Sequence, residues 1–215
     1  ALHFIDRRRS GRSAERHLLQ QRRPLGPRRH RHAAVHDDPG PAATDDATHL
    51  LNFSAAGEVT GEVVFAGYGI TAPEYNYDDY AGLDVHDAIV LVLTNEPGEL
   101  DSTSRFDGTI NTPHADLRTK AINAREHGAM GLLVVNGPQW HHGEPLRAPA
   151  RDGEGYMSSG LLAAQVSEAC ANALLAAAHT DLEHAQRDIE AHQQPHSFAI
   201  PDSAMLTLNV VRTRA

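Results

Sequence analysis

The strongest constraint on the fold is a run of six apolar residues at positions 88–93. Side chains alternate between the two faces of a strand, so an uninterrupted apolar run indicates a strand covered on both sides. A similar run follows at residues 130–135. Between them Thr112 can cap a helix, Pro113 suits its first turn and Gly128 supplies a C-terminal stop. The order strand, helix, strand predicts a parallel crossover unit.

Weaker patterns predict further elements on either side of this unit. Residues 63–66 indicate a buried strand that ends at Gly67-Tyr68-Gly69, and residues 161–166 indicate a short strand. Two helices are expected next, one capped by Ser167 and running to about residue 178, the other from Asp181 to about residue 192. Terminal strands are expected at residues 198–200 and 205–211, and a long exposed loop at residues 139–158.

Charge is distributed unevenly along the 215 residues, whose net charge is -9. Residues 1–36 carry a charge of +8 and the remainder carries -17. Residues 1–50 are charged, interrupted by proline and poor in apolar side chains, which predicts a disordered basic arm. Clustered arginines would also suit a nucleic-acid-binding arm. No aromatic residue lies among them to stack on bases, so nucleic acid is not the expected partner. The 18 arginines against one lysine are also typical of GC-rich coding.

Several function classes lack the sequence features that they require. No stretch approaches about 18 consecutive apolar residues, so no membrane-spanning helix and no membrane partner are expected. Arg7, Arg8 and Arg9 precede no apolar stretch, so we expect no secretory signal, and the compartment stays open. The single cysteine, Cys170, permits neither an internal disulfide nor a cysteine-based zinc cluster.

Motifs that carry chemistry are matched only superficially. Residues 67–72 fit G-x-G-x-x-A, but Pro73 follows and no helix begins there to bind a pyrophosphate. In residues 155–160 the glycines are one position too far apart for a nucleophile elbow. Fifteen histidines include no H-E-x-x-H motif, and Pro195 interrupts the pair His192/His196, which has i, i+4 spacing. We therefore assign no catalytic residue, no cofactor-binding residue and no metal ligand.

Some residues are instead expected to have structural roles. Asp78 and Asp79 are adjacent, so in an extended segment they point to opposite sides, and we expect them to order their loop by capping backbone N–H groups. Gly67 and Gly69 are expected to end a strand where the backbone needs special dihedral angles. Lys120 and Arg125 are expected on the exposed side of the central helix.

Three segments together resemble a known family. They read GEVVFAGYGI at residues 61–70, YDDYAGLDV at residues 77–85 and KAINAREHGA at residues 120–129. In this order they resemble the protease-associated (PA) domain carried within di-zinc aminopeptidases of the aminopeptidase Y type. The resemblance covers residues 58–136 and continues more loosely through residues 195–211.

The resemblance implies an α+β fold: a β-sandwich or barrel flanked by helices, in β/β/α layers. It places a PA domain at residues 51–211, whose last segment returns towards a peptidase domain that is missing here. Zinc in such enzymes is bound by an H-x-D-type motif after the PA domain. No such motif follows the PA domain before Ala215, so we expect a chain truncated before the zinc-binding region, with no zinc ligand of its own.

In this family the PA domain is not catalytic and frames the active-site cleft, and the relatives are commonly exported. The leading hypothesis is therefore a non-catalytic domain with a role in substrate access or protein interaction. Loops 95–111 and 136–158 are the expected contact surfaces for a peptide or protein, since loops carry function on a rigid scaffold. The alternative is a fragment of an active zinc aminopeptidase that another polypeptide completes.

Overall fold

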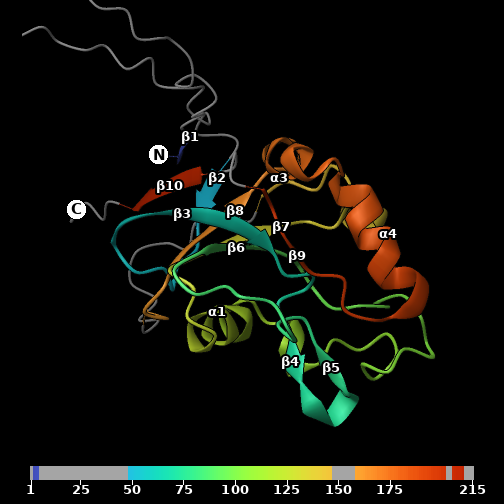
Figure 1. Cartoon of the computed structure of the whole chain (residues 1–215). Helices are drawn as coiled ribbons and strands as arrows, with labels where there is room; N and C mark the ends of the chain where they lie inside the picture. The colour runs from blue at the N-terminus through green and yellow to red at the C-terminus, as the bar shows by residue number, and fades with distance from the viewer. Residues whose placement is uncertain (1, 5–47, 147–157, 202–204, 211–215) are drawn as a thin grey trace, which may run out of the picture.

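A mixed eight-stranded sheet organises the molecule (Figure 1). The computed structural model describes residues 2–4, 48–146, 158–201 and 205–210. The strand order is β1-β10-β3-β6-β7-β8-β2, and β9 pairs with β3 beside this path. The strands are β1 (Leu2–Phe4), β2 (Thr48–Leu50), β3 (Gly57–Phe65), β6 (Ile89–Leu93), β7 (Gly131–Val135), β8 (Leu162–Val166), β9 (Phe198–Ala199) and β10 (Met205–Val210).

The long strand β3 joins two kinds of pairing. Its first part, residues 57–62, pairs antiparallel with β10, and residues 63–65 pair parallel with β6. Strands β6, β7 and β8 continue the parallel pairing, and β2 closes the far edge antiparallel to β8. A small hairpin of β4 (Thr71–Ala72) and β5 (Tyr77–Asp78) stands apart from this sheet, joined by the 3-10 helix η2 (Pro73–Tyr75).

Helices cover both faces of the sheet. Helix α1 (Leu117–Glu126) connects β6 to β7 on one face, and α3 (Glu168–Leu175) and α4 (Leu182–His192) lie on the other, as Figure 1 shows. The shorter helices are η3 (Pro113–Ala115), α2 (Pro138–His141) and η4 (Ala176–Ala178). The predicted parallel crossover is confirmed, and so is the mixed α+β class with helices that flank a sheet.

Strand β6 shows why the central run is apolar at every position. Val90 and Val92 pack in the core with Ala121 of α1, and Leu91 and Leu93 pack in the core beneath α3 and α4. All four strand residues are fully buried. Burial of each such side chain contributes about 1.5–3 kcal/mol, so this strand supports both cores at once.

The helix boundaries follow local capping. The helix expected after Thr112 is divided in two: Thr112 caps η3 by accepting from the His114 N–H, and Asp116 caps α1 by accepting from Arg118 and Thr119. Ser167 caps α3 as expected, and Asp181, where the second helix was expected to begin, caps α4.

Two predicted segments are only partly covered by the described residues. Of the N-terminal arm at 1–50, residues 2–4 form β1 and residues 48–50 form β2, and the rest lies outside the described part. The loop expected at 139–158 was wrong at its start, because residues 139–141 belong to helix α2, which Pro138 begins; residues 147–157 are not described.

Candidate functional site

Polar side chains collect at the carboxyl ends of β3, β6 and β7, where the chain leaves the sheet. Ligands of open α/β sheets bind in crevices at this edge. The residues there form two groups. We call Tyr77, Asp79, Glu96 and Lys120 the closed cluster. We call the hollow between α4, α2 and the loop after β6 the α4 pocket.

Asp79 is the centre of the closed cluster. Its carboxylate is buried and accepts hydrogen bonds from the Tyr68 and Ile70 N–H groups, both at 3.0 Å, and from the Tyr77 hydroxyl at 2.9 Å. Gly67 has a positive φ of 48°, and a Cβ there would lie 2.3 Å from Asp79 Oδ1. The half-buried Asp78 instead accepts from the Tyr80 N–H. The loop-ordering role predicted for both aspartates fits these contacts.

Lys120 corrects a prediction, because its side chain is fully buried rather than exposed. Its Nζ donates to the carbonyl of Tyr68 at 2.5 Å and to that of Asn95 at 2.6 Å. The sequence contained the signal: Lys120 lies three residues after Leu117 and four before Ala124, within the apolar stripe of α1. Its stem covers the sheet while its amine reaches the strand ends.

Arg125, on the same helix, is exposed as predicted and donates to the Ser159 carbonyl.

The charges of the closed cluster depend on one another. Burial raises the pKa of the Asp79 carboxyl, and the hydrogen bonds that it accepts and the charge of Lys120 counteract this. Burial lowers the pKa of Lys120, whereas the negative charges of Asp79 and Glu96 raise it. Glu96 is also buried and accepts from the Thr112 N–H at 2.8 Å and its hydroxyl at 2.5 Å. Each member has its partners within the protein, which is typical of a structural cluster.

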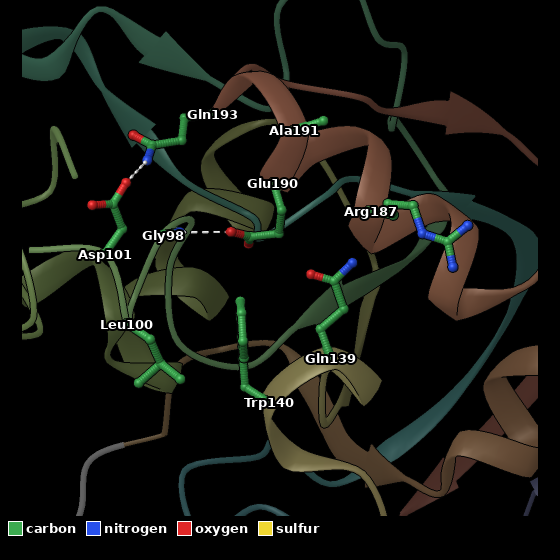
Figure 2. A pocket seen from close by; sticks show the side chains of 9 residues that line it. All are labelled: Gly98, Leu100, Asp101, Gln139, Trp140, Arg187, Glu190, Ala191 and Gln193. Atoms are coloured by element: carbon green, nitrogen blue, oxygen red, sulfur yellow. Dashed lines mark hydrogen bonds between the residues drawn. The ribbon is translucent and has the colours of Figure 1, made fainter. Parts of the chain in front are cut away.

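The α4 pocket is an open cavity of about 390 Å³ (Figure 2). This lies within the range of roughly 300–1,000 Å³ that ligand sites occupy. Loop 95–111 contributes Leu100 and Asp101, loop 136–158 contributes Trp140, and α4 contributes Glu190. The structure thus brings the two predicted contact loops together. The part played by Glu190 was missed, because no motif marks it.

Hydrogen bonds join both loops of this pocket to side chains of α4. The Tyr68 hydroxyl donates to Glu190 Oε1, and the Gly98 N–H donates to Glu190 Oε2 at 2.9 Å. Gln186 donates from Nε2 to the Tyr68 hydroxyl and accepts from the Gln139 N–H, each at 3.0 Å. Burial raises the pKa of Glu190 above its ordinary value. Both loops are therefore held in position by one helix.

His141, at the end of α2, also joins the two loops, through contacts with two carboxylates. Its Nε2 lies 2.5 Å from Glu99 and its Nδ1 lies 2.9 Å from Glu144. Burial alone would lower the pKa of His141, but these two carboxylates outweigh it and raise the pKa. The imidazolium form, which donates from both nitrogens, fits this arrangement.

Two features are absent from the described residues. No three or more His, Cys, Asp and Glu side chains come together there in a way that could hold a metal ion. Nor is any helix of the described part long and apolar enough to span a bilayer.

Solved structures that are similar to this chain include two bacterial aminopeptidases. The aminopeptidase of Aneurinibacillus sp. strain AM-1 is 20% identical, with a TM-score of 0.42 over 76% of this chain. BSAP, a zinc aminopeptidase of Bacillus subtilis, is 17% identical, with a TM-score of 0.39 over 79%. The matched parts cover only 27% and 28% of those two chains. Comparison with curated proteins gives no match.

Comparison with protein families gives a match that spans the central sheet. Residues 59–174, more than half of the chain, match the family described as PA domain. The matched range runs from β3 to α3, so it includes the whole closed cluster and both loops of the α4 pocket. The chain belongs to the PA domain family.

Proposed function

We propose that this PA domain is a non-catalytic module that binds a polypeptide segment in the α4 pocket. The observation that carries the proposal is the exposure of two large apolar side chains at a cavity. Leu100 is 63% exposed and Trp140 is 43% exposed, and both line the pocket. Exposed aromatic and aliphatic residues on positioned loops are typical anchors of protein recognition.

The chemistry of the pocket supports binding rather than catalysis. Its described lining has no hydroxyl, thiol or amine side chain that could act as a nucleophile. Asp79 and Lys120 are buried and closed to solvent, and both bind the backbone of Tyr68: Asp79 accepts from its N–H and Lys120 donates to its carbonyl. In a longer enzyme such a module would influence which polypeptide reaches the active site, which is the substrate-access role.

A hydrolysis assay tests the non-catalytic part of the proposal. The purified chain is incubated with aminoacyl-nitroanilides, with and without added zinc. We expect no release of nitroaniline above the protein-free control in either case. Zinc-dependent turnover would overturn the proposal and favour a fragment that carries aminopeptidase activity.

Trp140 gives a direct assay for binding, because it is the only tryptophan of the chain. Its emission is followed during titration with a pool of random pentapeptides that lack tryptophan. We expect a saturable change, which Leu100→Ser weakens by about 1–2 kcal/mol, as loss of an interface anchor does. Ile110→Ser is the matched control, since Ile110 is 74% exposed on the same loop but does not line the pocket. A flat titration would contradict the proposal.

A further inference from the structure

Two carboxylates in the α4 pocket are not neutralised by any cation of the described residues. Asp101 accepts from the Thr103 N–H and hydroxyl and from Gln193 Nε2. The hydrogen bonds from Thr103 hold the pKa of Asp101 below its ordinary value, so it is ionised at neutral pH. Among the described residues, Glu190 accepts from the Tyr68 hydroxyl and the Gly98 N–H. These partners are neutral, so both negative charges remain available to a ligand.

One basic side chain, Arg187, lines the pocket, and it is already paired with a carboxylate, as is the neighbouring His141. Arg187 donates to Glu183 at 2.6 Å, and Figure 2 shows its guanidinium directed away from Glu190 and Asp101. His141 lies between Glu99 and Glu144. The charge of Glu99 also acts on Glu190 and raises its pKa. The electrostatic balance of the pocket is therefore negative, and a cation would be favoured there.

The aromatic wall suits the same kind of ligand. Figure 2 shows the indole of Trp140 rising from α2 towards Gly98 and Glu190, with Leu100 to one side. A cation over an indole gains about 0.5–2 kcal/mol, and tryptophan is the best aromatic partner. The apolar stem of a long basic side chain can pack on Leu100 while its head reaches a carboxylate.

We infer that the α4 pocket binds a peptide segment through a lysine or arginine side chain. The stem of that side chain packs on Trp140 and Leu100, and its cationic head pairs with Glu190 and Asp101. The inference rests on the proposed function and adds the chemical class of the ligand. Charge complementarity selects this occupant, because a neutral side chain would leave both carboxylates without a counter-charge.

Two peptides that differ only in one charge test the inference. Acetylated and amidated Ala-Leu-Arg-Leu-Ala is compared with the same peptide carrying citrulline, the neutral isostere, in place of arginine. The blocked termini leave the arginine as the only charge. Trp140 emission is followed at low ionic strength. We expect the arginine peptide to bind about 10-fold tighter, and the advantage to fall as salt screens it.

Variants locate the preference within the pocket. Asp101→Asn removes one charge from an exposed position and should reduce the arginine advantage several-fold, as should Glu190→Gln. Glu126→Gln is the matched control, because it removes the same charge from an exposed position on α1, across the sheet from α4. It should leave the preference unchanged.

The outcomes of these experiments distinguish the preference for a basic side chain from the proposed peptide-binding function on which it rests. Equal binding of both peptides would overturn the inference and leave the peptide-binding function intact. Binding of neither peptide, together with a flat response to the random pool, would overturn both. An arginine preference that survives both Asp101→Asn and Glu190→Gln would overturn the assignment of the cation to this pocket.

Discussion

Tyr68 belongs to both polar groups at the carboxyl edge of the sheet, and it shows how they differ. Its backbone binds Asp79 and Lys120 in the closed cluster, and its hydroxyl donates to Glu190 in the α4 pocket. On the backbone side every charged atom meets a protein partner and is closed to solvent. On the hydroxyl side the carboxylates meet neutral donors and open onto a cavity.

At one edge of the sheet, the closed cluster therefore has the features of a structural group and the α4 pocket has those of a recognition site. Fully partnered buried charges fix three strand ends and leave nothing for a ligand to satisfy. The pocket carboxylates have no counter-charge and lie beside an exposed indole, so a bound ligand can still form favourable contacts with them. Shifted pKa values alone do not distinguish the two groups, because burial shifts the pKa of Asp79 and Lys120 in one and of Glu190 in the other.

Removal of Asp79 is expected to have the largest effect on stability. Asp79→Ala removes the carboxylate whose charge acts most strongly on the buried Lys120, and it leaves the Tyr68 and Ile70 N–H groups without an acceptor. Loss of one partner of a buried pair costs about 3–5 kcal/mol. The free energy of unfolding is measured by urea denaturation followed by circular dichroism.

Asp78→Ala is the matched control for this measurement. Asp78 is half-buried and accepts from the Thr71 hydroxyl and the Tyr80 N–H, so its loss should cost about 1 kcal/mol. If both substitutions cost the same, the closed cluster is not the structural centre that the contacts indicate.

A methyl group added at Gly67 tests how tightly the closed cluster is packed. Gly67→Ala puts a Cβ against the Asp79 carboxylate and forces an alanine to a φ of 48°, so we expect a loss of about 3 kcal/mol. Gly82→Ala provides the comparison, since Gly82 also has a positive φ, 73°, but a Cβ there meets no atom within 4 Å. Its cost should be about 1 kcal/mol, from the backbone alone. Equal losses in denaturation would mean that contact with Asp79 contributes nothing.

The sequence predicted those parts of the fold that local pattern determines. Apolar runs predicted strands β6, β7 and β8, and caps and helical spacing predicted helices α1, α3 and α4. The three-residue strands β1 and β2 are too short to show a period, and only their pairing with β10 and β8 makes them strands. Such pairing depends on tertiary contacts that no local window contains.

The candidate site was predicted in part, for the same reason. Loops 95–111 and 136–158 were identified by their composition. Glu190 approaches Gly98 across 92 residues of sequence, and nothing near either residue indicates that contact. Lys120 was misplaced because charge was given more weight than its position in the apolar stripe of α1.

His141 offers the smallest and most selective test, because it strengthens the pocket only when charged. Its pKa is raised in the folded protein, so its contribution is complete below the unfolded value of 6.5 and is lost as the pH rises through the folded value. His141→Gln should therefore destabilise the protein near pH 6, by about 1 kcal/mol or less because solvent still reaches the half-buried ring and screens its ion pairs, and should have no effect near pH 9.

Thermal melts of both proteins at the two pH values measure this difference. His86→Gln is the control, because His86 is largely exposed and faces one equally exposed carboxylate, that of Asp87. A destabilisation by His141→Gln that is equal at both pH values would mean that the ring acts by packing alone. The contrast between the α4 pocket and the closed cluster would then rest on the uncompensated charges of Asp101 and Glu190 alone.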